Sequence, residues 1–269
     1  MGTVPLRATW ASFRAMLKQQ FLLLSRYPLN LLANFFLVLA SVIIIMLVMT
    51  LFSPETVGQR LRGITLYGFV IYLFLSHTLW TVGMSLERET EEGTLTGLYL
   101  SPASRFLTLL ARAVAALTWT AVAGLAGLLL AQTITGRLPV HQPGLALVIL
   151  LFTVSGLIGL GFAIAGLALR FGQAVELAAN LLEFGLMGLC AFFFPFGLLP
   201  PALQYLARLI PLSYSVDAFR TVALGEPRPE LLSLEAELVI IIVTGLAGPP
   251  LGYGIYWLNE RVARREGLL

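Results

Sequence analysis

Residues 29–52 read LNLLANFFLVLASVIIIMLVMTLF, a run of 24 residues without a charged side chain. A helix needs about 20 mostly apolar residues to cross the hydrocarbon core of a membrane. The run exceeds the roughly 7–15 apolar residues of a secretory signal peptide, and a long basic leader precedes it. It therefore predicts a retained membrane span.

Five further runs have the length and apolar character of a span, and they cover residues 64–86, 106–134, 145–169, 175–194 and 238–258. The chain is 58% hydrophobic and only 12% charged, whereas soluble domains carry about 25% charged residues. These patterns predict an all-α integral membrane protein with six transmembrane helices.

The leader, residues 1–28, is amphipathic. Its apolar residues recur every three or four positions and share one helical stripe: Leu6, Trp10, Phe13, Leu17, Phe21 and Leu24. Arg7, Arg14 and Lys18 lie beside that stripe. We expect this helix to lie flat at the membrane surface, with its cations near anionic lipid headgroups. The alternative is a cytoplasmic helix that packs on the protein itself.

The basic residues set the expected orientation. With the N-terminus inside, 11 of the 17 lysine and arginine residues fall on the cytoplasmic side and 6 fall outside. Because positive residues favour the cytoplasm, we expect both termini of this multi-pass cell-membrane protein to lie there. In residues 195–236, helical pieces at 202–210 and 215–224 are too short to cross. We expect them to fold back into the outer leaflet.

Residue counts exclude several kinds of chemistry. One cysteine, Cys190, and two histidines cannot make a cysteine-cluster or histidine-rich metal site. Lys18 is the only lysine, and no phosphate-binding loop of the Walker type is present. We therefore expect no metal and no cofactor bound by this chain, and any ATP must be bound by another chain. The basic residues flank apolar runs, which argues against a nucleic-acid partner.

The densest charge cluster lies between the second and third spans. It reads ERETEEGTLT over residues 87–96, and on a helix Arg88 would meet Glu91 and Glu92. A small apolar ridge follows at helical spacing. A charged end beside an apolar ridge favours docking into a partner's groove over a merely solvated loop.

The sequence resembles the type-2 permeases of ABC transporters, the membrane subunits of ATP-driven exporters. Glu-Arg-Glu-x-Glu-x-Gly-Thr-Leu from residue 87 and Leu-x-Leu-Ser-Pro-x-Ser-Arg from residue 98 are similar to the family's cytoplasmic loop. Phe-Pro-Phe-Gly-Leu-Leu-Pro from residue 194 and Pro-Leu-Ser-Tyr from residue 211 resemble its segment before the last span, and Arg220 falls where the family often has an arginine. The ordered motifs cover most of the chain.

The resemblance implies a single transmembrane permease domain over residues 1–269. Residues 1–28 would be an elbow helix, 29–194 the first five spans with a coupling helix near 87–99, 195–236 an outer re-entrant segment, and 237–269 the last span and cytoplasmic tail. The coupling residues would be Glu87, Arg88, Glu89, Glu91, Glu92, Gly93 and Thr94. An outer gate would contain Phe194, Pro195, Pro200 and Pro211.

The resemblance also implies partners and a task. Two copies of an ABC ATPase subunit would bind ATP and magnesium. A second permease chain, identical or different, would complete a transporter in a bacterial or archaeal plasma membrane. The chain would be a transport subunit and not an enzyme. Its apolar interior and Arg26-Tyr27-Pro28 entry favour export of a drug or lipid, a lipophilic or amphiphilic substrate. Export of a polysaccharide or glycolipid is the alternative.

The fifth span carries a polar stripe whose members recur every three or four residues: Glu176, Asn180, Glu183, Met187, Cys190 and Phe194. A carboxylate inside a membrane is expensive and normally faces a cavity or a partner. We predict that Asn180, Glu183 and Met187 line the substrate path, and the resemblance adds Tyr72 of the second span.

A purely structural alternative explains the same acids. Glu176 would then pair with Arg112 or Arg170, and Glu183 would be protonated against a hydroxyl or an amide. Intramembrane acids are functional candidates by default, but the sequence alone leaves both interpretations open.

Other small or polar residues in the spans are expected to serve packing. Small residues four apart let helices approach closely, and they occur as Ser155, Gly159 and Ala163 in the fourth span and as Gly248 and Gly252 in the sixth. His77 is expected to pack or to hydrogen-bond to another helix. Asp217 and Arg220, three residues apart, are expected to form a local pair.

Two rival functions stay open. A proton-coupled secondary transporter that uses Glu183 as its proton carrier fits the spans but leaves the motif at 87–96 unexplained. An intramembrane enzyme needs a convergent nucleophile, base or metal ligands, and the candidates His77, Glu183 and Asp217 lie on different segments without a recognisable motif.

Overall fold

A computed structural model describes residues 6–26, 28–52, 55–91, 93, 104–135 and 140–267 of the chain. Within these ranges the protein is helical and contains no strand. The elements in chain order are α1 (Leu6–Arg26), α2 (Pro28–Phe52), α3 (Glu55–His77), the π-helix η1 (Thr78–Gly83), α4 (Ser85–Glu91), α6 (Arg105–Thr135), α7 (Pro143–Phe171), α8 (Ala174–Leu189), the 3-10 helix η2 (Phe196–Leu198), α9 (Pro201–Leu209), α10 (Pro211–Leu224) and α11 (Leu234–Arg265).

Four helical stretches of the described chain are long and apolar enough to cross a membrane: Arg60–Glu91, Arg105–Ile134, Pro143–Phe171 and Leu234–Arg265. They contain the expected second, third, fourth and sixth spans. The chain is therefore an all-α membrane protein. α2 coincides with the first expected span; it has 25 residues, and Leu32–Val48 is the apolar stretch within it whose side chains the structure describes.

The fifth expected span, residues 175–194, differs from the structure. α8 ends at Leu189 after 16 residues, about 24 Å at 1.5 Å per residue. A turn follows in which Ala191 has a positive φ of 50°, a conformation that ends a helix. The apolar composition continues through the turn, but the backbone does not stay helical.

The second expected span also has different limits. α3 begins at Glu55, between the first two expected spans. It is followed by η1 and α4, and together they form the crossing Arg60–Glu91. Of residues 87–99, where a coupling helix is expected, the structure describes the end of this long helix as far as Glu91, and Gly93. Glu92 and Thr94 lie outside the described residues.

The stretch Arg60–Glu91 lies at the centre of the bundle. It is 72% buried over its apolar window, whereas the other three crossings are 17–39% buried. The π-helix η1 packs against α7, and α3 packs against α6 and α10. α1 packs on α6, where the Thr108 hydroxyl meets the Met16 sulfur at 3.7 Å, so this helix also contacts the protein itself.

The tightest pairing joins α7 and α11. A Cβ atom added at Gly159 would overlap the backbone carbonyl of Gly248, and one added at Gly252 would overlap the carbonyl of Gly159. The Ser155 hydroxyl donates to the carbonyl oxygen of Gly245 at 2.6 Å. These contacts confirm that the small residues of the fourth and sixth spans pack the two backbones together.

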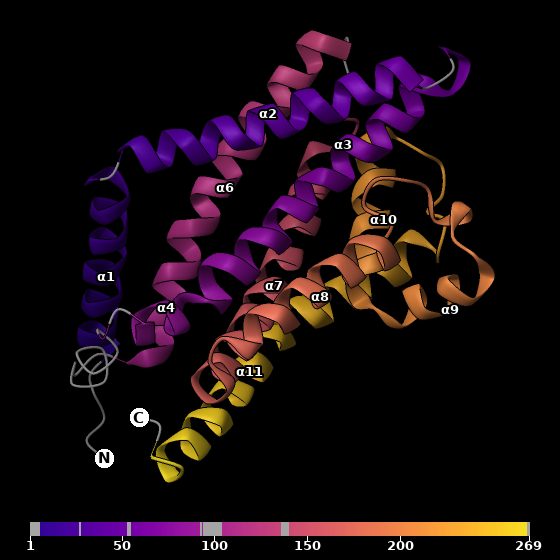
Figure 1. The fold of residues 1–269 in the computed structure, drawn as a ribbon. Helices are drawn as coiled ribbons and strands as arrows, with labels where there is room; N and C mark the ends of the chain where they lie inside the picture. The colour runs from indigo at the N-terminus through magenta and orange to yellow at the C-terminus, as the bar shows by residue number, and fades with distance from the viewer. Residues whose placement is uncertain are drawn as a thin grey trace.

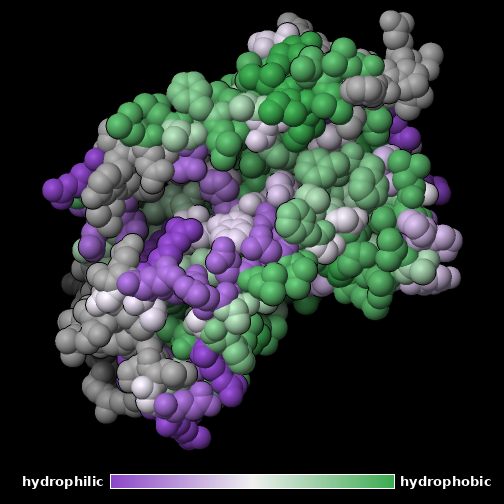
Figure 2. All heavy atoms as spheres, viewed as in Figure 1, coloured by the Kyte–Doolittle hydropathy of each residue, from purple (hydrophilic) through white to green (hydrophobic). Residues whose placement is uncertain are grey.

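The bundle has two different ends (Figure 1). One end gathers α4 and the C-terminal parts of α7 and α11, where Arg105 binds Glu260 at 2.5 Å and Arg170 binds Glu266 at 3.3 Å. α9 and α10 lie toward the other end, where Arg60 of α3 binds Glu226 at 2.6 Å. Figure 2 shows hydrophobic surface over α2 and around α8 and α9, and hydrophilic residues near the end of α11.

Candidate functional site

Glu183 lies at the buried side of α8. The helix presents Leu177, Leu181 and Phe184 outward, each more than 60% exposed. Glu183 is only 6% exposed. The opposite placement of apolar and acidic side chains turns the carboxyl group toward α3 and η1, inside the bundle.

Two neutral side chains hold the Glu183 carboxyl group. The Tyr72 hydroxyl of α3 donates to Oε1 at 2.9 Å, and the Trp80 indole N–H of η1 donates to Oε2 at 2.6 Å. Tyr72 was expected here from the family resemblance, whereas Trp80 was not. The carboxyl group does meet a hydroxyl, as the structural alternative required, but it also receives a second donor.

The π-helix bears directly on this arrangement. Tyr72 and Trp80 are eight residues apart, which in a regular α-helix separates their directions by about 80°. The wider turns of η1, Thr78–Gly83, change the direction in which Trp80 projects. π-turns within α-helices are frequent at functional sites. Periodicity arguments based on 3.6 residues per turn cannot place Trp80 beside Glu183.

Aromatic rings surround Tyr72. Its ring centroid lies 5.8 Å from that of Phe192 and 5.6 Å from that of Phe193. Phe69 lies 6.2 Å from Tyr72 and 6.3 Å from Phe193. The Glu183 site is thus a single acid at the edge of an aromatic cluster built from α3 and the turn after α8.

The cluster contains no cationic partner for the acid. Within the described residues no lysine, arginine or histidine forms an ion pair with Glu183. His77 is near enough to interact electrostatically, but its Nδ1 hydrogen-bonds to the Thr120 hydroxyl of α6 at 3.0 Å. This contact confirms that His77 bonds to another helix. We use the name Glu183 cluster for Glu183, Tyr72, Trp80, Phe192 and Phe193.

The other members of the predicted stripe diverge. Asn180 is half-buried and donates to the carbonyl oxygen of Glu176, one turn earlier, at 3.1 Å. Met187 is half-buried against the main core. Glu176 is exposed and forms no ion pair with Arg112 or Arg170, because these arginines bind Glu89 and Glu266.

The expected outer-gate residues fall in the segment after α8. Phe194 and Pro195 follow the turn, and Phe194 packs beside a small cluster that contains Phe196. Pro200 precedes α9, and Pro211 is the first residue of α10. These proline positions separate η2, α9 and α10 from one another.

Arg220 of α10 holds this segment to the bundle, a role that the sequence did not indicate. Its guanidinium group is 5% exposed and donates to the carbonyl oxygens of Ala191 at 2.6 Å, of Phe194 at 3.2 Å and of Phe192. The Thr65 hydroxyl of α3 donates to Phe193 at 2.8 Å. Four consecutive carbonyl groups of the turn after α8, those of residues 191–194, thereby accept a side-chain hydrogen bond, as buried backbone polar groups require.

The expected pair between Asp217 and Arg220 does not form. Asp217 is 4% exposed and accepts a hydrogen bond from the backbone N–H of Leu231 at 2.7 Å. Glu237 of α11 and Glu230 lie beside it. Burial is the main cause that raises the pKa of Asp217 from 3.8 to about 6.

This carboxyl group predicts a pH dependence of stability. Between pH 3.8 and about 6 the folded state binds more protons at Asp217 than the unfolded state does. The free energy of unfolding should therefore fall as pH rises through this window, by at most about 3 kcal/mol. Thermal unfolding in detergent from pH 4 to 7 measures it. Asp217→Asn should make the dependence shallower, while the exposed Glu235→Gln should keep it. An unchanged slope in Asp217→Asn would refute the assignment.

The expected coupling residues lie where α4 ends. Glu87 is buried, Arg88 is exposed, and Glu89 forms an ion pair with Arg112 of α6. Glu91 accepts a hydrogen bond from the Gln173 amide at 3.2 Å. Gly93 has a φ of 69°, which favours glycine. Most acids of this cluster therefore make contacts inside the chain, and Arg88 is left facing outward.

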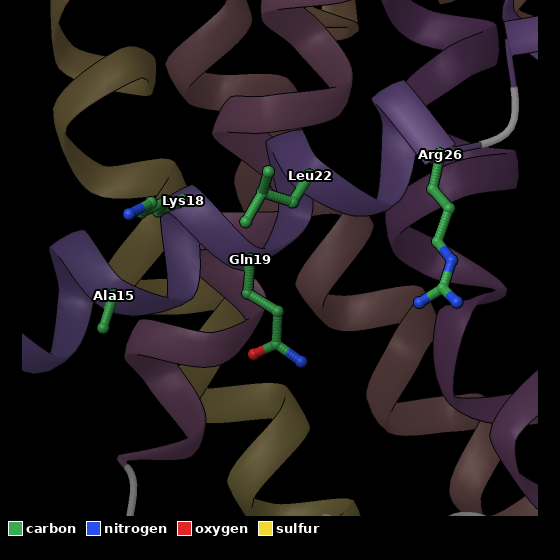
Figure 3. A pocket seen from close by; sticks show the side chains of 5 residues that line it. All are labelled: Ala15, Lys18, Gln19, Leu22 and Arg26. Carbon is green, nitrogen blue, oxygen red and sulfur yellow. The ribbon is translucent and has the colours of Figure 1, made fainter.

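A hollow of about 470 Å³ lies on α1, lined by Ala15, Lys18, Gln19, Leu22 and Arg26. Figure 3 shows Gln19 and Arg26 pointing to one side of the helix and Lys18 to another. α1 carries no acidic residue, and Lys18 and Arg26 form no ion pair with the residues that the structure describes.

The fold and the site together define a multi-pass integral membrane protein with a polar centre inside an apolar helical bundle. The described residues hold no group of three or more metal-ligating side chains. A family model described as ABC-2 type transporter matches residues 11–224, and the chain belongs to that family. It is therefore a membrane permease of an ABC transporter, a transport component and not itself catalytic, and its family implies association with an ABC ATPase. No curated protein matches the chain.

Proposed function

We propose that the chain exports a lipophilic or amphiphilic substrate, of the drug or lipid class, from the cytoplasm or the inner leaflet. The observation that carries this proposal is the Glu183 cluster, a buried polar and aromatic centre between α3 and α8. Polar groups inside a membrane are costly and mark substrate pathways. Asn180 and Met187, one turn away on either side of Glu183, would extend the path along α8.

The proposed topology has six crossings and cytoplasmic termini. α2 and α8, with the turn that follows α8, would complete the four long crossings. The excess of basic residues on the α4 side supports this orientation. η2, α9 and α10 would then form the outer segment, with Phe194, Pro195, Pro200 and Pro211 at the exit.

The exposed side of α8 supports a second permease chain as partner. Leu177, Leu181 and Phe184 form an apolar strip on it. A Cβ atom added at Gly185 would meet no neighbour within 4 Å. Small residues beside an apolar strip favour close helix packing in a membrane. The substrate path would run between the two permeases.

α1 is proposed to contact anionic lipid headgroups through Lys18 and Arg26. Both cations line the hollow on α1, and Leu22 beside them is 58% exposed. Cations next to exposed apolar side chains are typical of helices at the membrane interface. Packing of α1 on α6 is compatible with this position, because the helix presents another side to its neighbour.

Energy would come from two copies of a separate ATPase subunit that bind ATP and magnesium. The proposed contact is the end of α4, with Glu87, Arg88, Glu89, Glu91, Glu92, Gly93 and Thr94 near the partner. Arg88 is the basic side chain of α4; it is exposed and makes no ion pair within the described chain. It is therefore the residue whose change tests docking with the least effect on the fold.

The test is co-purification followed by transport in reconstituted vesicles. The permease should co-purify with an ABC ATPase, and a fluorescent amphiphile should move only when ATP is supplied. Transport driven by a pH gradient without ATP would overturn the proposal in favour of a proton-coupled carrier. ATP-driven transport of an oligosaccharide-lipid, with no transport of simple amphiphiles, would favour the polysaccharide or glycolipid exporter.

Arg88→Glu is expected to reduce ATP-driven transport at least about tenfold, because reversal of an interfacial charge costs binding energy and docking specificity. Thermal stability of the isolated permease should not change. The matched control is Arg208→Glu on α9, an exposed arginine at the other end of the bundle. Normal transport and normal co-purification in Arg88→Glu would remove this end of α4 from the contact.

A further inference from the structure

We propose that the Glu183 cluster selects substrates that carry a positive charge, so that the transported class is lipophilic organic cations. This inference rests on the proposed function and adds the sign of the substrate charge. Two observations support it: Glu183 accepts hydrogen bonds from two neutral side chains, and it forms no ion pair within the described chain.

Both donors to Glu183 are neutral, and each oxygen accepts one hydrogen bond. Both carboxyl oxygens therefore serve as acceptors, and neither contact brings a positive charge to the site. Buried ionised groups are normally paired with an opposite charge. Within the described chain Arg60, Arg105, Arg112 and Arg170 form ion pairs with acids at the bundle ends, but Glu183 forms none.

The Glu183 carboxyl group can accept more hydrogen bonds than it does. A carboxylate offers about four lone-pair sites on its two oxygens. Tyr72 and Trp80 use one site on each oxygen. Sites are therefore left for an N–H donor or a close cation, and the two bonds hold the carboxylate plane in one orientation. Tyr72 and Trp80 act as positioning residues for the acid.

Aromatic rings lie beside the acid. The ring centroid of Tyr72 lies 5.8 Å from that of Phe192 and 5.6 Å from that of Phe193. The faces of aromatic rings attract cations within about 6 Å of the centroid. The same rings bury the apolar body of an amphiphile. An acid beside such rings complements a diffuse organic cation, whereas it repels an anion of equal size.

The experiment compares two probes of nearly the same shape and opposite charge, tetraphenylphosphonium and tetraphenylborate. Binding is measured by equilibrium dialysis with the permease in nanodiscs of zwitterionic lipid, and empty nanodiscs give the lipid contribution. We expect tetraphenylphosphonium to bind at least about tenfold more tightly than tetraphenylborate. Glu183→Gln should abolish that preference, because it removes the charge and keeps the size.

Three further variants secure the result. Glu183→Asp should retain the preference for the cation, and Glu176→Gln, an exposed acid on the same helix, should leave it unchanged. Tyr72→Phe should weaken cation binding less than Glu183→Gln does, because the ring is kept. If Glu183→Gln does not fold, retention of the preference in Glu183→Asp with its weakening in Tyr72→Phe still supports the site. Equal binding of both probes to the wild type overturns it.

This binding assay separates the inference from the proposed function, because it needs neither ATP nor the ATPase. ATP-driven transport of a neutral amphiphile together with equal binding of the two probes would overturn the charge preference alone. A clear charge preference without any ATP-dependent transport would overturn the exporter function and leave the binding site standing.

Discussion

Arg220→Met is expected to open the outer end of the bundle and to lower the free energy of unfolding by at least about 3 kcal/mol. The change removes the charged donor to the carbonyl groups of Ala191, Phe192 and Phe194. Ala191 keeps a weaker bond from the backbone N–H of Phe194 at 3.3 Å, whereas the carbonyl groups of Phe192 and Phe194 lose their side-chain donor. Each buried acceptor left without a partner costs about 1–3 kcal/mol. Methionine keeps much of the side-chain length, so the loss is mainly one of hydrogen bonds and charge.

Arg220 is well suited to this role because it stays charged. Burial lowers its pKa from 12.5 to about 10, which still leaves the guanidinium protonated at neutral pH. Charged donors make hydrogen bonds about twice as strong as neutral ones. The turn also faces α3 closely, since a Cβ atom added at Gly68 would overlap the Phe192 carbonyl group and the Arg220 guanidinium.

The single cysteine reports on this opening. Cys190 is fully buried directly after α8, so a maleimide should label it slowly in the wild type. Arg220→Met should raise the labelling rate at least about tenfold, the factor given by a 1.4 kcal/mol loss of protection. The matched control is the exposed Arg208→Met. Arg220→Lys should fall between the two because it keeps one charged donor. Slow labelling in Arg220→Met would contradict the proposed role.

The helices themselves were largely predictable from the sequence, because long apolar runs need no partner information. The expected spans 106–134 and 145–169 differ from α6 and α7 by at most two residues at each end. The fifth span failed for a physical reason. Its apolar run continues to residue 194, but the helix ends where Ala191 turns and Arg220, 29 residues further on, captures its carbonyl. Periodicity does not report such a contact.

The site was predictable in part. Glu183 stood out because an acid in an apolar span is costly, and Tyr72 followed from the family resemblance. Trp80 was missed because it lies in a π-helix, where regular spacing fails. The coupling cluster shows a similar limit. A charged end beside an apolar ridge predicted docking into a partner, and that stays a prediction; the ion pair of Glu89 with Arg112 of α6 was not foreseen, because composition does not indicate a pairing between separate segments.

Gly252→Ala should separate α7 from α11 and destabilise the fold strongly, although it adds only one methyl group. The added Cβ would overlap the Gly159 carbonyl group, which is backbone and cannot rotate away. The two helices would have to move apart along their whole contact, the tightest in the bundle. Overpacking of a well-filled site costs about 1–3 kcal/mol, and we expect the upper part of this range because the neighbour is main chain.

Gly254→Ala is the matched control, two residues further along the same helix. A Cβ atom there meets nothing within 4 Å, so alanine should be neutral or stabilising by up to about 1 kcal/mol through its higher helix propensity. Thermal unfolding of both variants in the same detergent measures the contrast. Helix propensity alone predicts two equal gains, whereas backbone contact predicts a loss at residue 252 and a gain at residue 254. Equal midpoints for the two variants would show that α7 and α11 do not approach as closely as their glycines indicate.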